Sequence, residues 1–105
     1  MAGLTRSILR LRAKRGRRDE LVELFERLGI FAAAREQGGF IAAELQVPLD
    51  DAEEVVVTAT WTSPEAYDGW LASPGRAEIG AHLEPLLDGE PESRTYLIVH
   101  ELRSA

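Results

Sequence analysis

The segment Glu54-Val55-Val56-Val57-Thr58-Ala59-Thr60-Trp61-Thr62-Ser63-Pro64-Glu65 decides the fold, because a strand and the start of a helix follow each other in it almost directly. Its first eight residues are rich in β-branched side chains, which favour a strand that ends at Trp61. Ser63 is a helix-capping residue, Pro64 suits the first helical turn, and Glu65 lies near the positive helix end. The segment therefore predicts a β-strand followed by an α-helix.

The residues just before this segment predict a second strand that pairs with the first. Residues 40–47 alternate in character, with apolar side chains at the odd positions and Glu44 and Gln46 at even ones. This period of two is typical of a half-buried strand. Pro48 closes the run, and the paired aspartates in residues 49–52 favour a tight turn. We therefore expect residues 40–47 and 54–61 to form a hairpin.

The first forty residues predict a strand and one long helix. Residues 7–12 alternate near their end, so that leucines face one side and arginines the other. After a turn around Gly16, Asp19 is expected to cap a helix whose apolar stripe includes Leu21 and Phe25. Gly29 weakens the middle of this helix, and Gly38 with Gly39 should end it.

The C-terminal third predicts a broken helix and a last strand. The helix that starts at Pro64 is interrupted at residues 73–75, and a further helical piece places Ile79, His82, Leu83 and Leu86 on one stripe. A loop over 88–92 then leads to a strand over 96–102. The element order β-α-β-β-α-β indicates a single α+β domain, residues 1–105, of the ferredoxin-like kind with an antiparallel sheet.

Composition excludes several function classes. The chain has 105 residues, of which 45% are hydrophobic and 29% charged, as in an ordinary globular domain. It has no cysteine, so disulfides and thiolate chemistry are excluded. We expect a cytoplasmic protein, because neither a signal peptide nor a membrane-length apolar run is present. Basic residues cluster before Asp19, yet the net charge is −6 and no aromatic residue lies among them, so we expect no nucleic-acid partner.

The two faces of the predicted sheet differ, and this difference indicates a homodimer. The more apolar face, which two helices would cover, carries Leu9, Leu11, Ile41, Leu45, Val47, Val55, Val57 and Trp61. The opposite face mixes charged, polar and apolar side chains, including Arg10, Glu44 and Ile8. Such a face suits closure by a second copy of the chain. The alternative is a solvated open sheet, which antiparallel sheets tolerate.

The element order and the segment 61–74 resemble the antibiotic biosynthesis monooxygenase family. In that family a strand ending in tryptophan leads into a short helix that begins with Ser and an acid, and a break and another helix follow. The glycine turn 15–17 and the strand entry 38–40 fit the same pattern. The resemblance implies a dimeric α+β barrel formed by two sheets, with the helices outside.

The resemblance also implies site residues. Trp61 and Tyr67 match aromatic positions that line the family's oxygenase pocket, whereas Trp70 and His82 resemble the tryptophan and histidine of its heme-degrading branch. Both branches use an asparagine, but this chain contains none, and Val57 stands at the oxygenase-like position. We therefore expect neither heme cleavage nor the best-known oxygenase arrangement.

The predicted site has catalytic and substrate-binding members. We assign His82, Tyr67 and Trp61 as catalytic residues, with His82 as the base. The substrate-binding residues are Trp70, Arg76 and Phe25. The alternatives are a core histidine, packing aromatics and a solvent-exposed arginine. His100 on the last strand could pair with Glu44. Two isolated histidines make a poor metal site, so no metal is predicted.

The function implied is a cofactor-independent monooxygenase that holds a planar aromatic or polyketide-like molecule in a pocket between helices and sheet. The pocket would lie on the side away from the dimer lumen, with Trp61, Tyr67, Trp70 and His82 at its border. Two alternatives stay open: a non-oxidative isomerase or cyclase, and a non-catalytic dimeric ligand-binding module.

Overall fold

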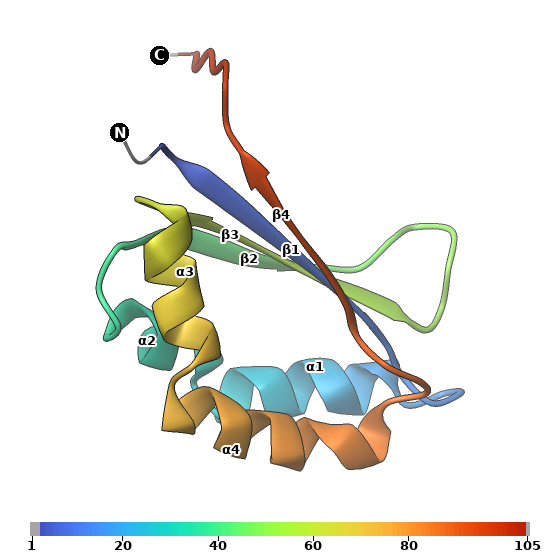
Figure 1. The fold of residues 1–105 in the computed structure, drawn as a ribbon. Helices are drawn as coiled ribbons and strands as arrows, with labels where there is room; N and C mark the ends of the chain where they lie inside the picture. Colours follow the sequence, from blue (N-terminus) through green and yellow to red (C-terminus); the bar gives the residue numbers. More distant parts are fainter. Residues whose placement is uncertain (1–2, 105) are drawn as a thin grey trace.

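A computed structural model describes residues 3–104, and residues 1, 2 and 105 of the predicted domain lie outside the described part. The elements are β1 (Thr5–Arg12), α1 (Arg18–Arg27), α2 (Ile30–Arg35), β2 (Phe40–Gln46), β3 (Glu54–Trp61), α3 (Pro64–Leu71), α4 (Pro74–Leu83), a 3₁₀ turn (Glu84–Leu86) and β4 (Glu92–Leu97). The strands form an antiparallel sheet in the order β2-β3-β1-β4. All four α-helices lie on one face of this sheet (Figure 1). The predicted ferredoxin-like α+β fold is confirmed.

The first helical region differs from the prediction, because it is two helices. The expected cap, Asp19, lies inside the first turn of α1, and Arg17 holds the N-cap position without a side-chain hydrogen bond. Gly29 then takes a left-handed conformation, with a φ angle of 65°, and separates α1 from α2. After this change of direction Ile30, the first residue of α2, is buried with 7% of its surface exposed.

A bulge in β2 changes which side chains of this strand lie on the apolar face of the sheet. The register against β3 shifts between Phe40 and Ala42, because one extra residue is accommodated in β2. Phe40 therefore packs against the core together with Leu45, whereas Ile41 is 44% exposed. Val47, which follows the end of β2, is also exposed. The strict alternation from 41 to 47 was thus wrong at both ends of the strand.

The last strand begins and ends earlier in the sequence than predicted. β4 pairs with β1 from Glu92, opposite Arg10, to Leu97, opposite Thr5. Ile98 still donates its N–H to the carbonyl of Leu4 (2.9 Å), but β1 has no residue left to pair with beyond that point. Residues 98–104 leave the sheet and extend past the end of β1 (Figure 1). His100 is exposed in this segment and lies outside β4, which ends at Leu97. Its pairing with Glu44 in the lumen of a dimer stays a prediction.

The β2–β3 loop forms the predicted turn, and Asp51 holds it. The Asp51 carboxylate accepts the backbone N–H groups of Glu53 (2.8 Å) and Glu54 (3.0 Å) and a hydrogen bond from Arg12 (2.8 Å). Bonds to the charged form stabilise it, so the pKa of Asp51 falls to about 2, with the Glu53 amide as the largest cause. The loop that joins β2 to β3 is therefore held by an ionised side chain at neutral pH.

The core lies between the sheet and the helices. Its most buried side chains include Trp61, Leu21 and Val55, which come from β3 and α1. Among residues 3–104, no helix is both long and apolar enough to cross a lipid bilayer.

Candidate ligand cavity between the helices and the sheet

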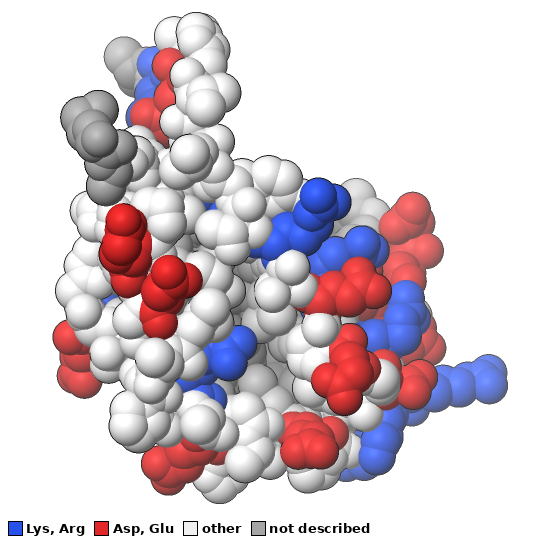
Figure 2. Space-filling view, in the orientation of Figure 1, with Lys and Arg blue, Asp and Glu red and all other residues white. Residues whose placement is uncertain are grey.

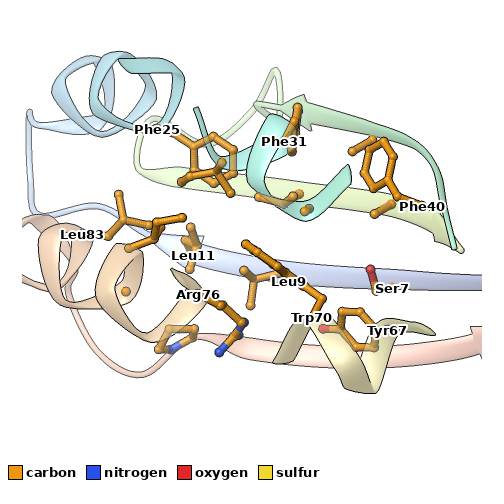
Figure 3. Close-up of a pocket in the computed structure, with 18 of the residues that line it drawn as sticks. Ser7, Leu9, Leu11, Phe25, Phe31, Phe40, Tyr67, Trp70, Arg76 and Leu83 are labelled. Atoms are coloured by element: carbon orange, nitrogen blue, oxygen red, sulfur yellow. The ribbon is translucent and has the colours of Figure 1, made fainter. Parts of the chain in front are cut away.

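The helical layer and the sheet do not close completely, and they leave a cavity of about 200 Å³. Side chains of β1, β2, β3 and all four helices line it. Figure 3 shows Phe25, Phe31 and Phe40 along one side, with Tyr67 and Arg76 on the other. Figure 2 shows the face of the molecule hollowed near its centre, with both basic (blue) and acidic (red) atoms around the hollow. The cavity itself is largely apolar, and Arg76 is the one charged residue among the described residues that line it.

An aromatic cluster forms one end of the cavity. The ring of Trp61 meets Phe40 edge to face, with centroids 5.5 Å apart, and lies 5.6 Å from the ring of Tyr67. Trp61 is only 1% exposed. Offset and edge-on contacts of this kind stabilise aromatic pairs beyond the area that they bury. The cluster is thus a rigid wall of the cavity as well as part of the core.

Two serine caps place the helical side chains of the site. Ser63 accepts the N–H of Ala66 (3.1 Å) and starts α3 directly after β3, which brings Tyr67 back over the sheet. Ser73 donates its hydroxyl to the carbonyl of Trp70 (2.8 Å) and accepts the N–H of Arg76 (3.3 Å). Because Ser73 is buried and joins α3 to α4, it couples the positions of Trp70 and Arg76.

Four of the residues that line the otherwise apolar cavity carry side-chain polar groups: Ser7, Trp61, Tyr67 and Arg76. Trp61 Nε1 donates to Ser7 Oγ (3.1 Å). Burial raises the pKa of Tyr67, and this outweighs the opposite influence of the Arg76 charge and the Ser7 hydroxyl. The phenol is therefore neutral at pH 7 and can donate a hydrogen bond.

The structure brings together five of the six predicted site residues. Trp61, Tyr67, Trp70, Arg76 and Phe25 all line the cavity. His82 does not: its side chain is exposed, and the expectation that it borders the cavity was wrong.

The phase of α4 explains the position of His82. The cavity-facing stripe of α4 is formed by Arg76, Ile79, Gly80 and Leu83. Successive residues of an α-helix are about 100° apart, so His82 lies roughly a quarter turn away from Leu83. The sequence pattern put His82 on the apolar stripe because Leu86 was counted in the same helix, but α4 ends at Leu83 and Leu86 belongs to the 3₁₀ turn.

Sequence reasoning did not identify Ser7, Phe31 or Phe40 as members of the site. The sequence does contain a signal for Ser7. This hydroxyl residue lies two positions before Leu9 and four before Leu11, so all three share the face of β1 that points to the helices. Phe40 had no such signal, because its inward orientation depends on the bulge in β2. Phe31 lies on α2, whose direction depends on the left-handed Gly29.

The fold and the cavity together define a small α+β protein with a helix-covered aromatic site on one face of its sheet. The chain belongs to the antibiotic biosynthesis monooxygenase family, whose sequence model matches residues 6–81. No functionally curated protein matches its sequence.

Solved structures agree with this fold. SnoaB from Streptomyces nogalater, described as a cofactor-independent oxygenase, has a TM-score of 0.80 and 24% identity over 98% of this chain and 100% of its own. A putative family member from Chloroflexus aurantiacus J-10-fl has a TM-score of 0.73 and 22% identity over 95% and 97% of the two chains. A putative member from Nitrosomonas europaea has a TM-score of 0.82 at 8% identity, over 95% and 94%. At these identities the likeness establishes the fold.

Proposed function

We propose that the chain is a cofactor-independent monooxygenase of a planar, weakly acidic aromatic or polyketide-like molecule that binds in the cavity. The observation that carries this proposal is the lining: aromatic and aliphatic side chains surround Arg76, the one charged side chain among the described residues that line the cavity. A cavity with apolar walls and few convergent polar groups is typical of a small-molecule site. Membership of the family supports the same reaction class.

The charge in the cavity indicates the ionisation state of the substrate. Among residues 3–104, no histidine, lysine or carboxylate side chain lines the cavity, so a base that titrates near neutral pH does not face it. Arg76 instead favours a bound anion, because an unlike charge is worth more where water is excluded. The proposed substrate is therefore acidic enough to bind as an enolate or phenolate.

The cavity volume limits the bound part of the substrate. An apolar cavity of about 150 Å³ in another protein accommodates benzene. By this comparison, about 200 Å³ suits one or two fused rings, with the rest of a larger molecule at the mouth. One- and two-ring hydroxyaromatic compounds are therefore suitable first substrates for assay.

The proposed reaction balances without a further reductant. The substrate binds already ionised, after its CH₂ group has lost a proton to water, and the carbanion form of this anion adds to O₂ and gives a peroxide anion. Protonation of this anion followed by loss of water leaves a ketone, so that CH₂ and O₂ become C=O and H₂O. In this chain Trp61 and Trp70 orient the ring, while Tyr67 and Arg76 stabilise the negative oxygen.

Oxygen uptake tests this function. Wild-type protein should raise the rate of O₂ consumption by 1-naphthol, a two-ring phenol whose keto tautomer has a CH₂ group, above the rate without protein, and the product should be the quinone and water. Arg76→Met should lower kcat/KM at least tenfold, since a hydrogen bond to a charged group contributes about 1.5–3 kcal/mol. Arg35→Met is the matched control, because Arg35 is exposed and does not line the cavity. Equal rates for wild type and Arg76→Met would contradict the assigned role of Arg76.

A ligand-binding module is the second candidate. It is favoured by Val57, which lines the cavity where the family's oxygenases carry an asparagine, and by the lack of a titrating base among the described lining residues. Tight binding of the same compounds without any O₂ uptake above the blank would support this candidate instead.

We also propose that two copies associate through the sheet face that the helices leave uncovered. In the described part of the chain no element covers this face (Figure 1), and the apolar Leu97, Val99 and Leu102 are exposed beside it or beyond it. Exposed apolar side chains near a sheet edge favour pairing. Sedimentation at micromolar concentration should give about twice the mass of one chain. A monomer under these conditions would exclude the association.

A further inference from the structure

A groove on the surface shares one wall with the cavity. It has a volume of about 290 Å³ and is lined by residues of α1, α2 and β2. Three residues line both the groove and the cavity: Phe25, Ile30 and Phe31. The groove opens to solvent, because Glu26 and Ala32, which also line it, are exposed. The two hollows are therefore separated by a wall of side chains from α1 and α2.

Phe31 is the least buried member of this wall. Phe25 is 4% exposed and Ile30 is 7% exposed, so both belong to the core. Phe31 is only half-buried and packs against the edge of the core. Its ring meets the Phe25 ring edge to face, with centroids 5.3 Å apart, and this kind of contact stabilises the position of the ring. The Phe31 side chain is therefore a fixed partition, and shortening it disturbs the core less than shortening either neighbour.

The charges determine which end of a ligand faces Phe31. Arg76 is the one charged side chain among the described residues that line the cavity, and it lies on the side opposite Phe31 (Figure 3). Glu26 is the one charged side chain among the described residues that line the groove. A negative oxygen is attracted by Arg76 and repelled by Glu26. The apolar end of a bound ring system therefore points toward Phe31.

We propose that Phe31 is a specificity-determining residue that limits the ligand to two fused rings in line, and that a third ring enters the groove when this side chain is shortened. The cavity of about 200 Å³ accommodates one or two rings, and Phe31 closes it in the direction in which a third ring extends. Without this partition, about 290 Å³ of further space adjoins the cavity. The inference rests on the proposed function, because it takes the cavity as the ligand site.

Two quinones that differ by one ring test the limit. 1,4-Naphthoquinone is the product expected from 1-naphthol, and 1,4-anthraquinone has the same quinone ring with one more ring in line. The longer probe has more apolar surface, so a site without a partition binds it more tightly. Wild-type protein should instead bind naphthoquinone at least tenfold more tightly than anthraquinone. Quenching of tryptophan fluorescence measures both affinities, since Trp61 and Trp70 line the cavity, and the absence of cysteine excludes thiol addition to the quinones.

Shortening Phe31 should remove this preference. In Phe31→Ala the ratio of the anthraquinone affinity to the naphthoquinone affinity should rise at least tenfold above the wild-type ratio. Phe31→Leu should raise the same ratio by a smaller factor, because leucine fills part of the space of the ring. This second variant keeps more of the apolar contact with Phe25, so it tests the inference even if Phe31→Ala is unstable. Neither substitution changes a tryptophan, so the fluorescence signal is comparable in all variants.

A substitution at Ala32 tests whether the third ring enters the groove. Ala32 is an exposed residue of α2 that lines the groove and does not line the cavity. Ala32→Phe adds a ring at the groove, so in the Phe31→Ala background it should remove the gain in anthraquinone affinity. In the wild-type background the same substitution should change neither affinity, because Phe31 keeps the ligand out of the groove.

The outcomes distinguish this inference from the proposed function. A gain in anthraquinone affinity on shortening Phe31 that Ala32→Phe removes supports the inference. Three results overturn it while the cavity remains a ligand site: equal affinities for both quinones in wild type, an unchanged ratio in the Phe31 variants, or a gain that persists with Ala32→Phe. If neither quinone quenches the wild-type fluorescence, the proposed function fails and the inference fails with it.

Discussion

Trp61→Ala is expected to lower the free energy of unfolding by about 3–5 kcal/mol, the usual cost of truncating a large buried aromatic residue. Trp61 is 1% exposed and packs against Phe40 and Tyr67. Its removal also leaves Ser7 without the N–H that it accepts. Urea denaturation followed by circular dichroism measures the loss.

Two control variants separate the contributions of Trp61. Trp61→Phe keeps most of the apolar contact and removes the N–H, so it should cost less than Trp61→Ala. Leu71→Ala on α3 truncates a residue that is 38% exposed and should change stability little. A loss below about 1 kcal/mol for Trp61→Ala would show that the aromatic cluster is not part of the stabilising core. Because of the expected instability, Trp61→Ala is unsuitable as a test of catalysis.

Gly80→Phe is expected to weaken ligand binding at least tenfold, or about 1.4 kcal/mol, without destabilising the fold. Gly80 lines the cavity from α4, and a Cβ added there would meet no atom within 4 Å. The new ring can therefore occupy the space at the cavity without straining the backbone. Glycine is also a poor helix former, so the substitution should not lower helix stability.

Gly69→Phe provides the matched control for this variant. Gly69 lies inside α3, also has open space where a Cβ would be, and does not line the cavity. Quenching of tryptophan fluorescence by 1,4-naphthoquinone measures binding, since both tryptophans of the chain line the cavity. Equal affinity in Gly80→Phe and wild type would mean that the ligand does not occupy this cavity.

Local signals in the sequence were sufficient for the element order and for most of the site. The capping serine and the following proline placed the start of α3 at Pro64, and the Ser63 side chain makes the predicted kind of cap. Alternation in residues 7–12 assigned β1, the β-branched side chains of residues 54–61 assigned β3, and the period of two along β3 gave the inward orientation of Trp61. These elements depend on interactions within a few residues, which is why pattern and propensity identify them.

The remaining features depend on contacts between distant segments. The bulge at Phe40 exists only in the pairing of β2 with β3, and the bounds of β4 depend on where β1 ends. His82 is not part of the site, because α4 ends three residues before Leu86. The apolar stripe of α4 therefore differs from the one that the sequence suggested. Ser7 joined the site because β1 passes beneath Trp61 and Tyr67.

The sequence by itself therefore determined the fold class, the family and the residue types available to the site: two tryptophans, one inward tyrosine, Arg76 and no asparagine. Only the tertiary structure decided which of them meet. The helices cover the sheet without filling the space between Tyr67, Arg76 and the three phenylalanines, and this leaves a cavity rather than a solid core. The physical reason is that a cavity depends on how side chains from separate elements pack together, and no single segment encodes that packing.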